Sequence, residues 1–269
     1  CKAFAFSSCP FTTLTFPTSL EDLGNLALSN CDKLKELTTP INSTAPFYLL
    51  FGSEKENVPT SLKKVNIIAT EEIANQGFKD LKNIEEINVA EGLKKIGEKC
   101  FMGCYQLIKF VCPSTLETIG GSAFAFEKET TNTETSSFTE ENAPKADLFT
   151  IDFSKIDSSH TFSIGQNAFQ NRENIKEIVL PNFTSEIGIG AFYNCFKSSL
   201  EEVILKMPLL KSESVENEKT RGFKRYFVNT EDANLTPLFP QNLKKITISQ
   251  VEGKQLEDKA FCFSDVENE

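Results

Sequence analysis

The chain has 269 residues, of which 39% are hydrophobic and 25% are charged, and this balance is typical of a globular protein and excludes wholesale disorder. A formal net charge of −10 argues against nucleic acid as a partner, and no apolar run reaches the roughly 18 residues that a membrane helix needs. The aromatic part of the core must be built from Phe, because the chain has 24 Phe and no Trp.

The sequence repeats itself with a period of about two dozen residues, which lies in the leucine-rich-repeat range. The clearest copies are IGEKCFMGCYQLIKFVCPSTLETIG from Ile96, IGQNAFQNRENIKEIVLPNFTSEIG from Ile164 and IGIGAFYNCFKSSLEEVIL from Ile187. Their shared phrase is I-G-x-x-A-F-x-N-C-x-x-L-x-x-I-x-L-P. The Phe of this phrase recurs every 23 residues in two runs, Phe78, Phe101 and Phe124, then Phe169 and Phe192.

Each L-x-x-I-x-L segment predicts a short strand whose last residues alternate between core and solvent. Nine such segments occur, and in chain order they begin at Phe11, Leu34, Leu62, Ile84, Leu107, Leu148, Ile175, Leu200 and Leu243. Between strands, the A-F-x-N-C phrase predicts a turn of helix or a tight bend that points one Phe inward. The Gly that opens this phrase, at Gly97, Gly165 and Gly188, is expected to supply the bend.

A unit of this size cannot bury its own apolar face, so successive units must stack. The sequence therefore predicts an α/β fold: a right-handed leucine-rich-repeat solenoid of about nine units, with a parallel strand ladder on its concave face. Residues 1–269 are expected to form one domain with insertions at about 41–57, 127–146 and 206–240. The second insertion, rich in Thr, Glu and Asn, predicts a solvated loop, and the partly apolar third is expected to fold back over the core edge. Both ends break inside a unit, so the chain is expected to be a fragment of a longer protein.

These phrases resemble the BspA-like leucine-rich repeats, also called the Treponema pallidum type. Members of that family often interrupt the array with L-F-G followed by V-P-x-S-L-K-x-V-x-I, and residues 50–67 (LFGSEKENVPTSLKKVNI) match this passage, with a looser copy at 237–248. Cys100 stands where Ala is usual, and Leu28 replaces the Phe of an early unit. The resemblance implies a surface-exposed or secreted protein of a bacterium or parasitic protist, linked to adhesion, and it brings no catalytic residues.

The pattern of the eight cysteines favours packing in the core over disulfides or metal binding. Four of them recur in one slot of the repeat, where a free thiol is a small, well-buried hydrophobe: Cys9, Cys31, Cys104 and Cys195. The off-slot residues Cys100, Cys112 and Cys262 are the better candidates for any disulfide pairing. The spacing of Cys100, Cys104 and Cys112 fits no standard zinc pattern, so no metal site is predicted.

The sequence contains no clear set of catalytic residues. The single His, His160, lies in the loop SSHTF and is interpreted as a solvated residue, and without another His no nucleophile has an obvious base. No carboxylate pair stands out among 38 acidic residues, and no phosphate-binding glycine loop occurs. We therefore predict no enzymatic activity and no cofactor.

The exposed face of the strand ladder is the predicted binding surface. The residues that flank the inward Ile of each strand point to solvent, and the candidate ligand-binding set is Glu86, Asn88, Lys109, Val111, Asp152, Glu177, Val179, Glu202, Ile204 and Lys245. Within it, Val111, Val179 and Ile204 are expected to form an apolar strip, which favours a protein partner over a glycan because exposed apolar patches mark interfaces. The alternative is a solvated sheet face whose cross-strand ion pairs contribute little.

The leading function is a non-enzymatic cell-surface or secreted scaffold that binds a ligand, through protein–protein contact or adhesion, on this repeat surface. A rigid spacer that presents another module is the first alternative. An enzyme domain attached to the array outside this chain is the second.

Overall fold

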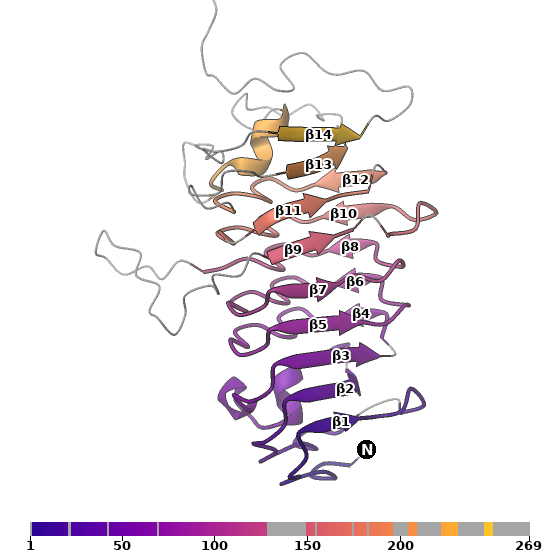
Figure 1. The fold of residues 1–269 in the computed structure, drawn as a ribbon, viewed down its shortest axis with the longest axis vertical. Helices are drawn as coiled ribbons and strands as arrows, with labels where there is room; N and C mark the ends of the chain where they lie inside the picture. The colour runs from indigo at the N-terminus through magenta and orange to yellow at the C-terminus, as the bar shows by residue number, and fades with distance from the viewer. Residues whose placement is uncertain are drawn as a thin grey trace, which may run out of the picture.

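The computed structural model describes residues 2–20, 23–41, 43–68, 70–127, 149–153, 155–173, 175–181, 183–195, 204–208, 222–230 and 245–249. Within these ranges, nine strands pair in parallel into one sheet that runs the length of the molecule (Figure 1). In spatial order they are β1 (Thr13–Thr15), β2 (Glu36–Pro40), β3 (Lys64–Ile68), β5 (Glu86–Val89), β7 (Lys109–Val111), β9 (Phe149–Asp152), β11 (Ile175–Val179), β13 (Ile204–Pro208) and β14 (Lys245–Ser249). Each predicted segment supplies one of them, which confirms the parallel ladder. The predicted starting points Leu148, Leu200 and Leu243 lie outside the described residues.

The strands form where the sequence alternates between apolar and polar side chains. In β3, Val65 and Ile67 are buried, whereas Lys64 and Asn66 are only half-buried on the other face. Leu34, Leu62 and Leu107, which open their phrases, precede the strands and are at most 1% exposed, whereas Phe11 at the start of the first phrase is exposed. Burial of one face fixes the register, because a shift by one residue would turn every apolar side chain to solvent.

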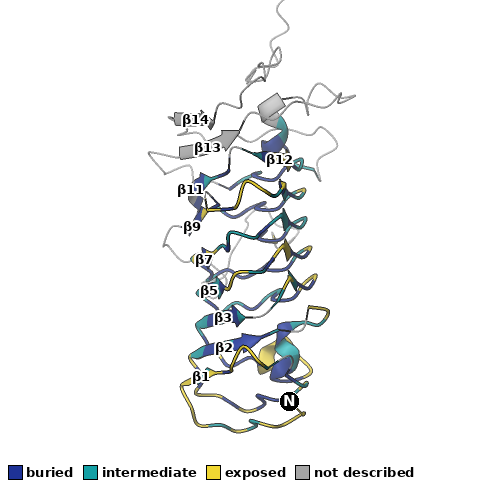
Figure 2. Cartoon of the chain, turned by 90° about the vertical axis from the view of Figure 1, so that its right-hand side faces the viewer, coloured by how far each residue is buried: buried dark blue, intermediate teal, exposed yellow. Residues whose placement is uncertain are grey.

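A second parallel sheet lies on the opposite side of the core (Figure 2) and was not predicted. Among the described residues it has five short strands, β4 (Glu72–Ile73), β6 (Lys95–Ile96), β8 (Thr118–Ile119), β10 (Phe162–Ile164) and β12 (Thr184–Ile187). Each contains or ends at the Ile of the repeat, and these Ile side chains are buried. The two ladders close the solenoid on two sides and enclose its core between them.

A column of Phe rings fills this core. Phe78, Phe101, Phe124, Phe169 and Phe192 are at most 1% exposed, and neighbouring ring centroids along this series lie 5.1–5.7 Å apart. The prediction that the repeated Phe points inward is therefore confirmed. Regular contact between aromatic rings at this spacing adds to the free energy gained from burial alone.

Two insertions contribute rings to the same column. In the first, the 3-10 helix η1 (Phe47–Leu50) places Phe47 4.5 Å from Phe78, and η2 (Lys55–Asn57) follows it. In the third, η4 (Gly222–Phe227) places Phe227 6.3 Å from Phe192, in agreement with the expectation that apolar parts of this insertion cover the core edge. Most of the second insertion, from residue 128 on, lies outside the described residues, as do 209–221 and 231–240 of the third.

The A-F-x-N-C phrase forms a tight bend instead of a helical turn. In each clear copy two residues four positions apart adopt left-handed backbone angles, as at Asn167 (φ 57°) and Asn171 (φ 60°) or Lys99 (φ 55°) and Gly103 (φ 74°). Side chains of Asn tolerate this conformation better than most. This explains why Asn recurs in the phrase. The described residues contain helix only as short 3-10 segments.

The role predicted for Gly97, Gly165 and Gly188 is wrong, because the left-handed bend begins two residues later. These glycines are needed where backbones of neighbouring units meet. A Cβ on Gly188 would lie 2.5 Å from the carbonyl carbon of Gly165 and 2.3 Å from the amide nitrogen of Gln166. Gly120 belongs to the same column, since its Cβ would lie 2.6 Å from the carbonyl carbon of Gly97. Close approach, not backbone flexibility, requires glycine at this position.

Three residues of the recurring Cys slot, Cys31, Cys104 and Cys195, are buried in the core as predicted, whereas Cys9 is half-buried at its edge. The Sγ of Cys104 donates to the Phe78 carbonyl at 3.0 Å, and that of Cys195 donates to the Phe169 carbonyl at 2.9 Å. Each thiol therefore satisfies the backbone of the preceding unit. Burial raises the pKa of Cys104 to about 12, which makes the thiol a poor nucleophile.

Candidate functional site

The outward side chains of the nine-stranded sheet form two columns along the molecule, which together we call the ladder face. The register of the strands places Thr13, Glu36, Lys64, Glu86, Lys109 and Thr150 side by side in the first column. The second column begins with Thr15, Thr38, Asn66, Asn88 and Val111. Acidic and basic residues therefore alternate along the first column, and amides stand next to each other in the second.

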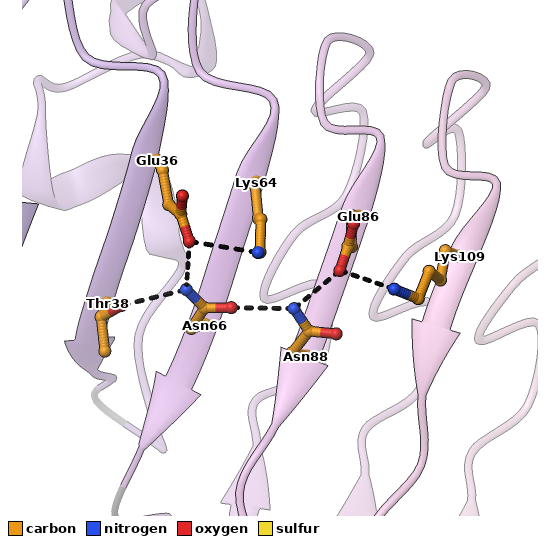
Figure 3. A network of polar contacts seen from close by, with 7 residues as sticks. All are labelled: Glu36, Thr38, Lys64, Asn66, Glu86, Asn88 and Lys109. Atoms are coloured by element: carbon orange, nitrogen blue, oxygen red, sulfur yellow. Dashed lines mark hydrogen bonds and ion pairs between the residues drawn. The ribbon is translucent and has the colours of Figure 1, made fainter. Parts of the chain in front are cut away.

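Hydrogen bonds join the two columns into one network across β2, β3, β5 and β7 (Figure 3). The Nδ2 of Asn66 donates to Glu36 Oε1 at 2.9 Å and to Thr38 Oγ1 at 3.0 Å. The Nδ2 of Asn88 in turn donates to Asn66 Oδ1 at 2.8 Å and to Glu86 Oε1 at 2.9 Å. Each amide thus bridges its own strand and the preceding one, so the orientations of these side chains depend on each other.

Two ion pairs complete the network. Lys64 Nζ lies 3.2 Å from Glu36 Oε1, and Lys109 Nζ lies 2.9 Å from Glu86 Oε1. The hydrogen bond from Asn66, followed by that from Lys64, lowers the pKa of Glu36 below its ordinary value. Lys109, followed by Asn88, lowers the pKa of Glu86 in the same way. These side chains are well hydrated, so each pair stabilises the fold by at most about 1 kcal/mol. Their main effect is to fix positions.

In the second column the network ends at Asn88, whereas in the first column it reaches Lys109 on β7. In Figure 3 the Oδ1 of Asn88 points along the ladder toward β7, and no contact to it is drawn. The next residue of the second column is Val111, which is 41% exposed and one of three exposed large apolar side chains among the described residues. The Asn88 amide oxygen, to which Figure 3 draws no contact within this network, therefore borders an exposed apolar side chain on the ladder face.

The expected apolar strip of Val111, Val179 and Ile204 is not continuous. β9 pairs with β11 so that Asp152 lies beside Val179, and the pairing of Lys109 with Thr150 aligns Asp152 with Val111. Asp152 is exposed and interrupts the two valines. Ile204 pairs with Glu177 and stands in the first column, because β13 starts later than its phrase suggests. The physical reason is the strand register, which the sequence phrase alone does not fix.

The structure brings part of the predicted ligand-binding set together. Glu86, Asn88 and Lys109 share the network, and Val111 borders it. Val179 is half-buried farther along the ladder. Of Glu177, Ile204 and Lys245 only the backbone is described, and it lies in the sheet, whereas Glu202 lies outside the described residues. Sequence reasoning left Glu36, Lys64 and Asn66 out of the set, although their alternation along the phrase marks them as outward-facing.

Arg172 is a buried cation that sequence reasoning also missed. It occupies the Cys slot of its unit (Phe169-Gln-Asn-Arg172), is fully buried, and donates to the carbonyls of Phe124 and Leu107. Its guanidinium carbon lies 3.8 Å from the centre of the Phe149 ring. Burial lowers the pKa of Arg172 to about 9. The sequence signal for this residue was that Arg replaces the usual Cys at this slot. The sequence alone does not show what the Arg contacts, because its partners belong to the neighbouring unit.

Among the described side chains, those suited to catalysis are not assembled on the ladder face. His160 Nδ1 lies 3.7 Å from Glu117 Oε1, away from the network, and both side chains are partly exposed. Within the described ranges, no group of three or more His, Cys, Asp or Glu side chains could hold a metal ion. No helix in those same ranges has the length and apolar character that crossing a bilayer requires. The arrangement is suited to non-covalent binding.

The amide network makes a testable contribution to acid stability. We expect Asn66→Ala to raise the pKa of Glu36 toward its ordinary value of 4.5 and to lower the free energy of unfolding by about 1 kcal/mol. Because the pKa of Glu36 is lower in the folded protein, its contribution is complete above pH 4.5 and is lost as the pH falls through the folded value. Carboxyl-carbon NMR titration and urea unfolding at pH 7 and pH 3 measure both effects.

Asn88→Ala is the comparison variant for this prediction: Asn88 donates to Glu86 and to Asn66 but does not contact Glu36, so its loss should shift the Glu36 titration less than Asn66→Ala does. An unchanged titration of Glu36 in Asn66→Ala would show that the network does not hold its carboxylate.

A family match agrees with this architecture. The family model described as BspA type leucine rich repeat region matches in 6 copies over residues 1–55, 56–144 and 147–215. Among solved structures, a leucine-rich repeat protein from Bacteroides ovatus is 21% identical, with a TM-score of 0.40 over 92% of this chain and 63% of that chain. The Treponema pallidum leucine rich repeat protein is 16% identical, with a TM-score of 0.34 over 78% and 72%.

A leucine rich cell surface protein from Faecalibacterium prausnitzii is 18% identical, with a TM-score of 0.30 over 61% of this chain and 41% of that chain. The chain thus spans less than two thirds of the length of the Bacteroides and Faecalibacterium proteins. A comparison with curated proteins gives no match.

Proposed function

The chain belongs to the BspA-type leucine-rich-repeat family, and from this premise we propose that it is a non-enzymatic scaffold that binds a protein through its ladder face. The observation that carries the proposal is the network of Glu36, Asn66, Asn88 and Glu86, which holds outward side chains of neighbouring strands in one arrangement. Side chains that are already ordered lose little conformational entropy when a ligand binds. The repeat surface is therefore pre-organised for recognition.

The chemistry at the end of the network favours a protein ligand. Val111 offers exposed apolar area, and Asn88 beside it offers a hydrogen-bond acceptor. Protein interfaces combine an apolar centre with surrounding polar groups of this kind. A glycan is the less favoured ligand, because the face presents no exposed aromatic ring among the described ladder residues. The setting that the family resemblance implies is the cell surface or the secreted state, where the function would be adhesion.

Binding to a defined set of matrix proteins tests this proposal. We expect the chain to bind at least one of immobilised fibronectin, laminin and collagen, and we expect Val111→Asp to weaken that binding at least about tenfold, since a charge buried at an interface centre lacks a partner. Surface plasmon resonance gives the dissociation constants.

The matched control is Thr118→Asp, which places the same charge on β8 of the opposite sheet. Equal loss in both variants would contradict a role of the ladder face, and no binding to any of the three proteins would contradict the choice of a matrix ligand. A rigid spacer is the second candidate. The continuous Phe column favours it because this column makes the array stiff, and it predicts that Val111→Asp has no effect on binding.

A further inference from the structure

Two thiols lie next to each other at the N-terminal end of the solenoid. Cys9 and Cys31 occupy the same slot of neighbouring units, 22 residues apart. The Sγ of Cys31 donates to the carbonyl of Phe6, three residues before Cys9, at 3.2 Å. The sequence favoured the off-slot cysteines for any pairing, but it is this pair of slot cysteines that the fold places on adjacent rungs.

The backbone around the pair independently supports their proximity. The amide of Phe6 donates to the Ala27 carbonyl and that of Ser8 to the Ser29 carbonyl, both at 2.8 Å, so the two segments run as adjacent rungs. The Ser29 hydroxyl donates to that of Ser7 at 2.9 Å. Adjacent hydrogen-bonded rungs lie about 5 Å apart, which falls inside the Cα separation of about 4.4–6.8 Å that a disulfide spans.

Accessibility separates this pair from the other described thiols. Cys9 is half-buried, whereas Cys31 on the adjacent rung is buried. Cys100 and Cys104 also lie near each other, but both are fully buried and out of reach of a soluble reagent. Cys112 is half-buried, and its Sγ contacts the Pro113 carbonyl at 3.4 Å. Among the described cysteines, only Cys9 and Cys31 combine an accessible thiol with a second thiol at the same slot of the adjacent rung.

We propose that Cys9 and Cys31 are a redox-active pair that closes to a disulfide across the first two units when it meets a small disulfide such as oxidised glutathione. The Cys9 thiolate attacks one sulfur of the reagent, forms a mixed disulfide and releases one thiol. The Cys31 thiolate then attacks the Cys9 sulfur and releases the second thiol. The two protein thiols are oxidised, the reagent is reduced to two thiols, and the two protons leave to solvent or to those thiols.

The place of the pair gives the disulfide a function. β1 is the edge strand of the nine-stranded sheet, its inward Leu14 is only half-buried, and Phe4 and Phe11 are 59% and 53% exposed. A weakly buried rung of this kind opens more readily than the packed core. A covalent link to the next unit would hold the rung closed in an oxidising compartment and release it in a reducing one.

Burial affects the rate of ring closure. The pKa of Cys31 is raised, chiefly by burial, so its thiolate becomes more available as the pH rises. The second step should therefore be the slower one and should accelerate between pH 7 and pH 9, which leaves the mixed disulfide at Cys9 as a trappable intermediate.

Oxidation of the whole chain with oxidised glutathione tests the proposal. We expect peptide mapping by mass spectrometry to show a Cys9–Cys31 link with loss of two hydrogens. In hydrogen exchange, residues 4–16 should gain at least about tenfold protection on oxidation, because the opened state of the first unit is restricted. Dithiothreitol should reverse both changes.

Cys9→Ser should abolish the link and the gain in protection, and it suits the test because the half-buried Cys9 tolerates a hydroxyl. Cys112→Ser, which alters the other half-buried described thiol, should leave both unchanged. The proposal is overturned if Cys9 stops at the mixed disulfide at pH 9, if Cys9 links to another cysteine, or if the link forms without protecting residues 4–16.

Discussion

Gly120→Ala is expected to destabilise the protein by about 3 kcal/mol or more, which corresponds to a fall in Tm of roughly 6–12 °C. The added Cβ would lie 2.6 Å from both the Glu98 amide nitrogen and the Gly97 carbonyl carbon. These are backbone atoms, so no rotamer change can relieve the overlap. The two units would have to separate, which would weaken the hydrogen bond of 2.8 Å from the Gly120 amide to the Ile96 carbonyl. Thermal and urea unfolding measure the effect.

The adjacent Gly121 is the control. Its Cβ would meet the Gln166 carbonyl oxygen at 3.4 Å and otherwise only the Glu98 side chain at 3.8 Å. Gly121→Ala should therefore change the free energy of unfolding by less than about 1 kcal/mol, with the reduced entropy of the unfolded chain offsetting the mild contact. If both variants lose the same stability, the glycine column is not set by contact between units.

Arg172→Ala is expected to cost about 3 kcal/mol. The substitution removes the guanidinium from the face of Phe149, leaves a cavity, and deprives the buried carbonyls of Leu107 and Phe124 of a donor. Arg172→Lys should lose more than half as much, because one ammonium cannot reach both carbonyls and lie flat on the ring. Urea unfolding at pH 7 gives the free energies, with near-ultraviolet circular dichroism to show that the core stays packed.

Glu173→Ala is the control that separates the loss of the buried guanidinium from the loss of any charged side chain at this place in the fold. Glu173 is half-buried beside Arg172 and accepts a hydrogen bond of 3.1 Å from Asn194. Its loss should cost less than 1 kcal/mol. A similarly small loss for Arg172→Ala would mean that the desolvation penalty of the buried cation cancels its contacts, and the role assigned to Arg172 would be wrong.

Much of the fold follows from the repeat itself. The period of the Phe and the alternation within L-x-x-I-x-L determine which side chains are buried, and this was enough to locate nine strands and the Phe column. The second ladder escaped prediction because its strands are only two to four residues long, too short for alternation to be visible. The glycines were misinterpreted because a close approach between units is a property of the stack and not of one unit.

The candidate site was less accessible to prediction. Outward positions such as Glu86, Asn88 and Lys109 follow from alternation, but the network requires the register between strands and the rotamers of the two Asn. Ile204 was placed in the wrong column for the same reason, since β13 pairs with β11 so that Ile204 lies beside Glu177. From the sequence, Arg172 would be taken for an ordinary surface residue. Its burial becomes visible only when the repeats are aligned and Arg172 is seen to occupy the position of the buried Cys in other units.

The second insertion separates units along the chain while leaving them adjacent in space. Contacts between ordinary neighbouring units join residues 22–26 positions apart, as in the bond from Cys104 to Phe78, whereas Asn171 and Phe126 are 45 apart. The entropy of closing a loop grows only with the logarithm of its length, so this doubling costs about 0.6 kcal/mol. The array can therefore accept long additional sequence between two rungs at little expense in stability, and it is at such joints that a new module can enter without disturbing the stack on either side.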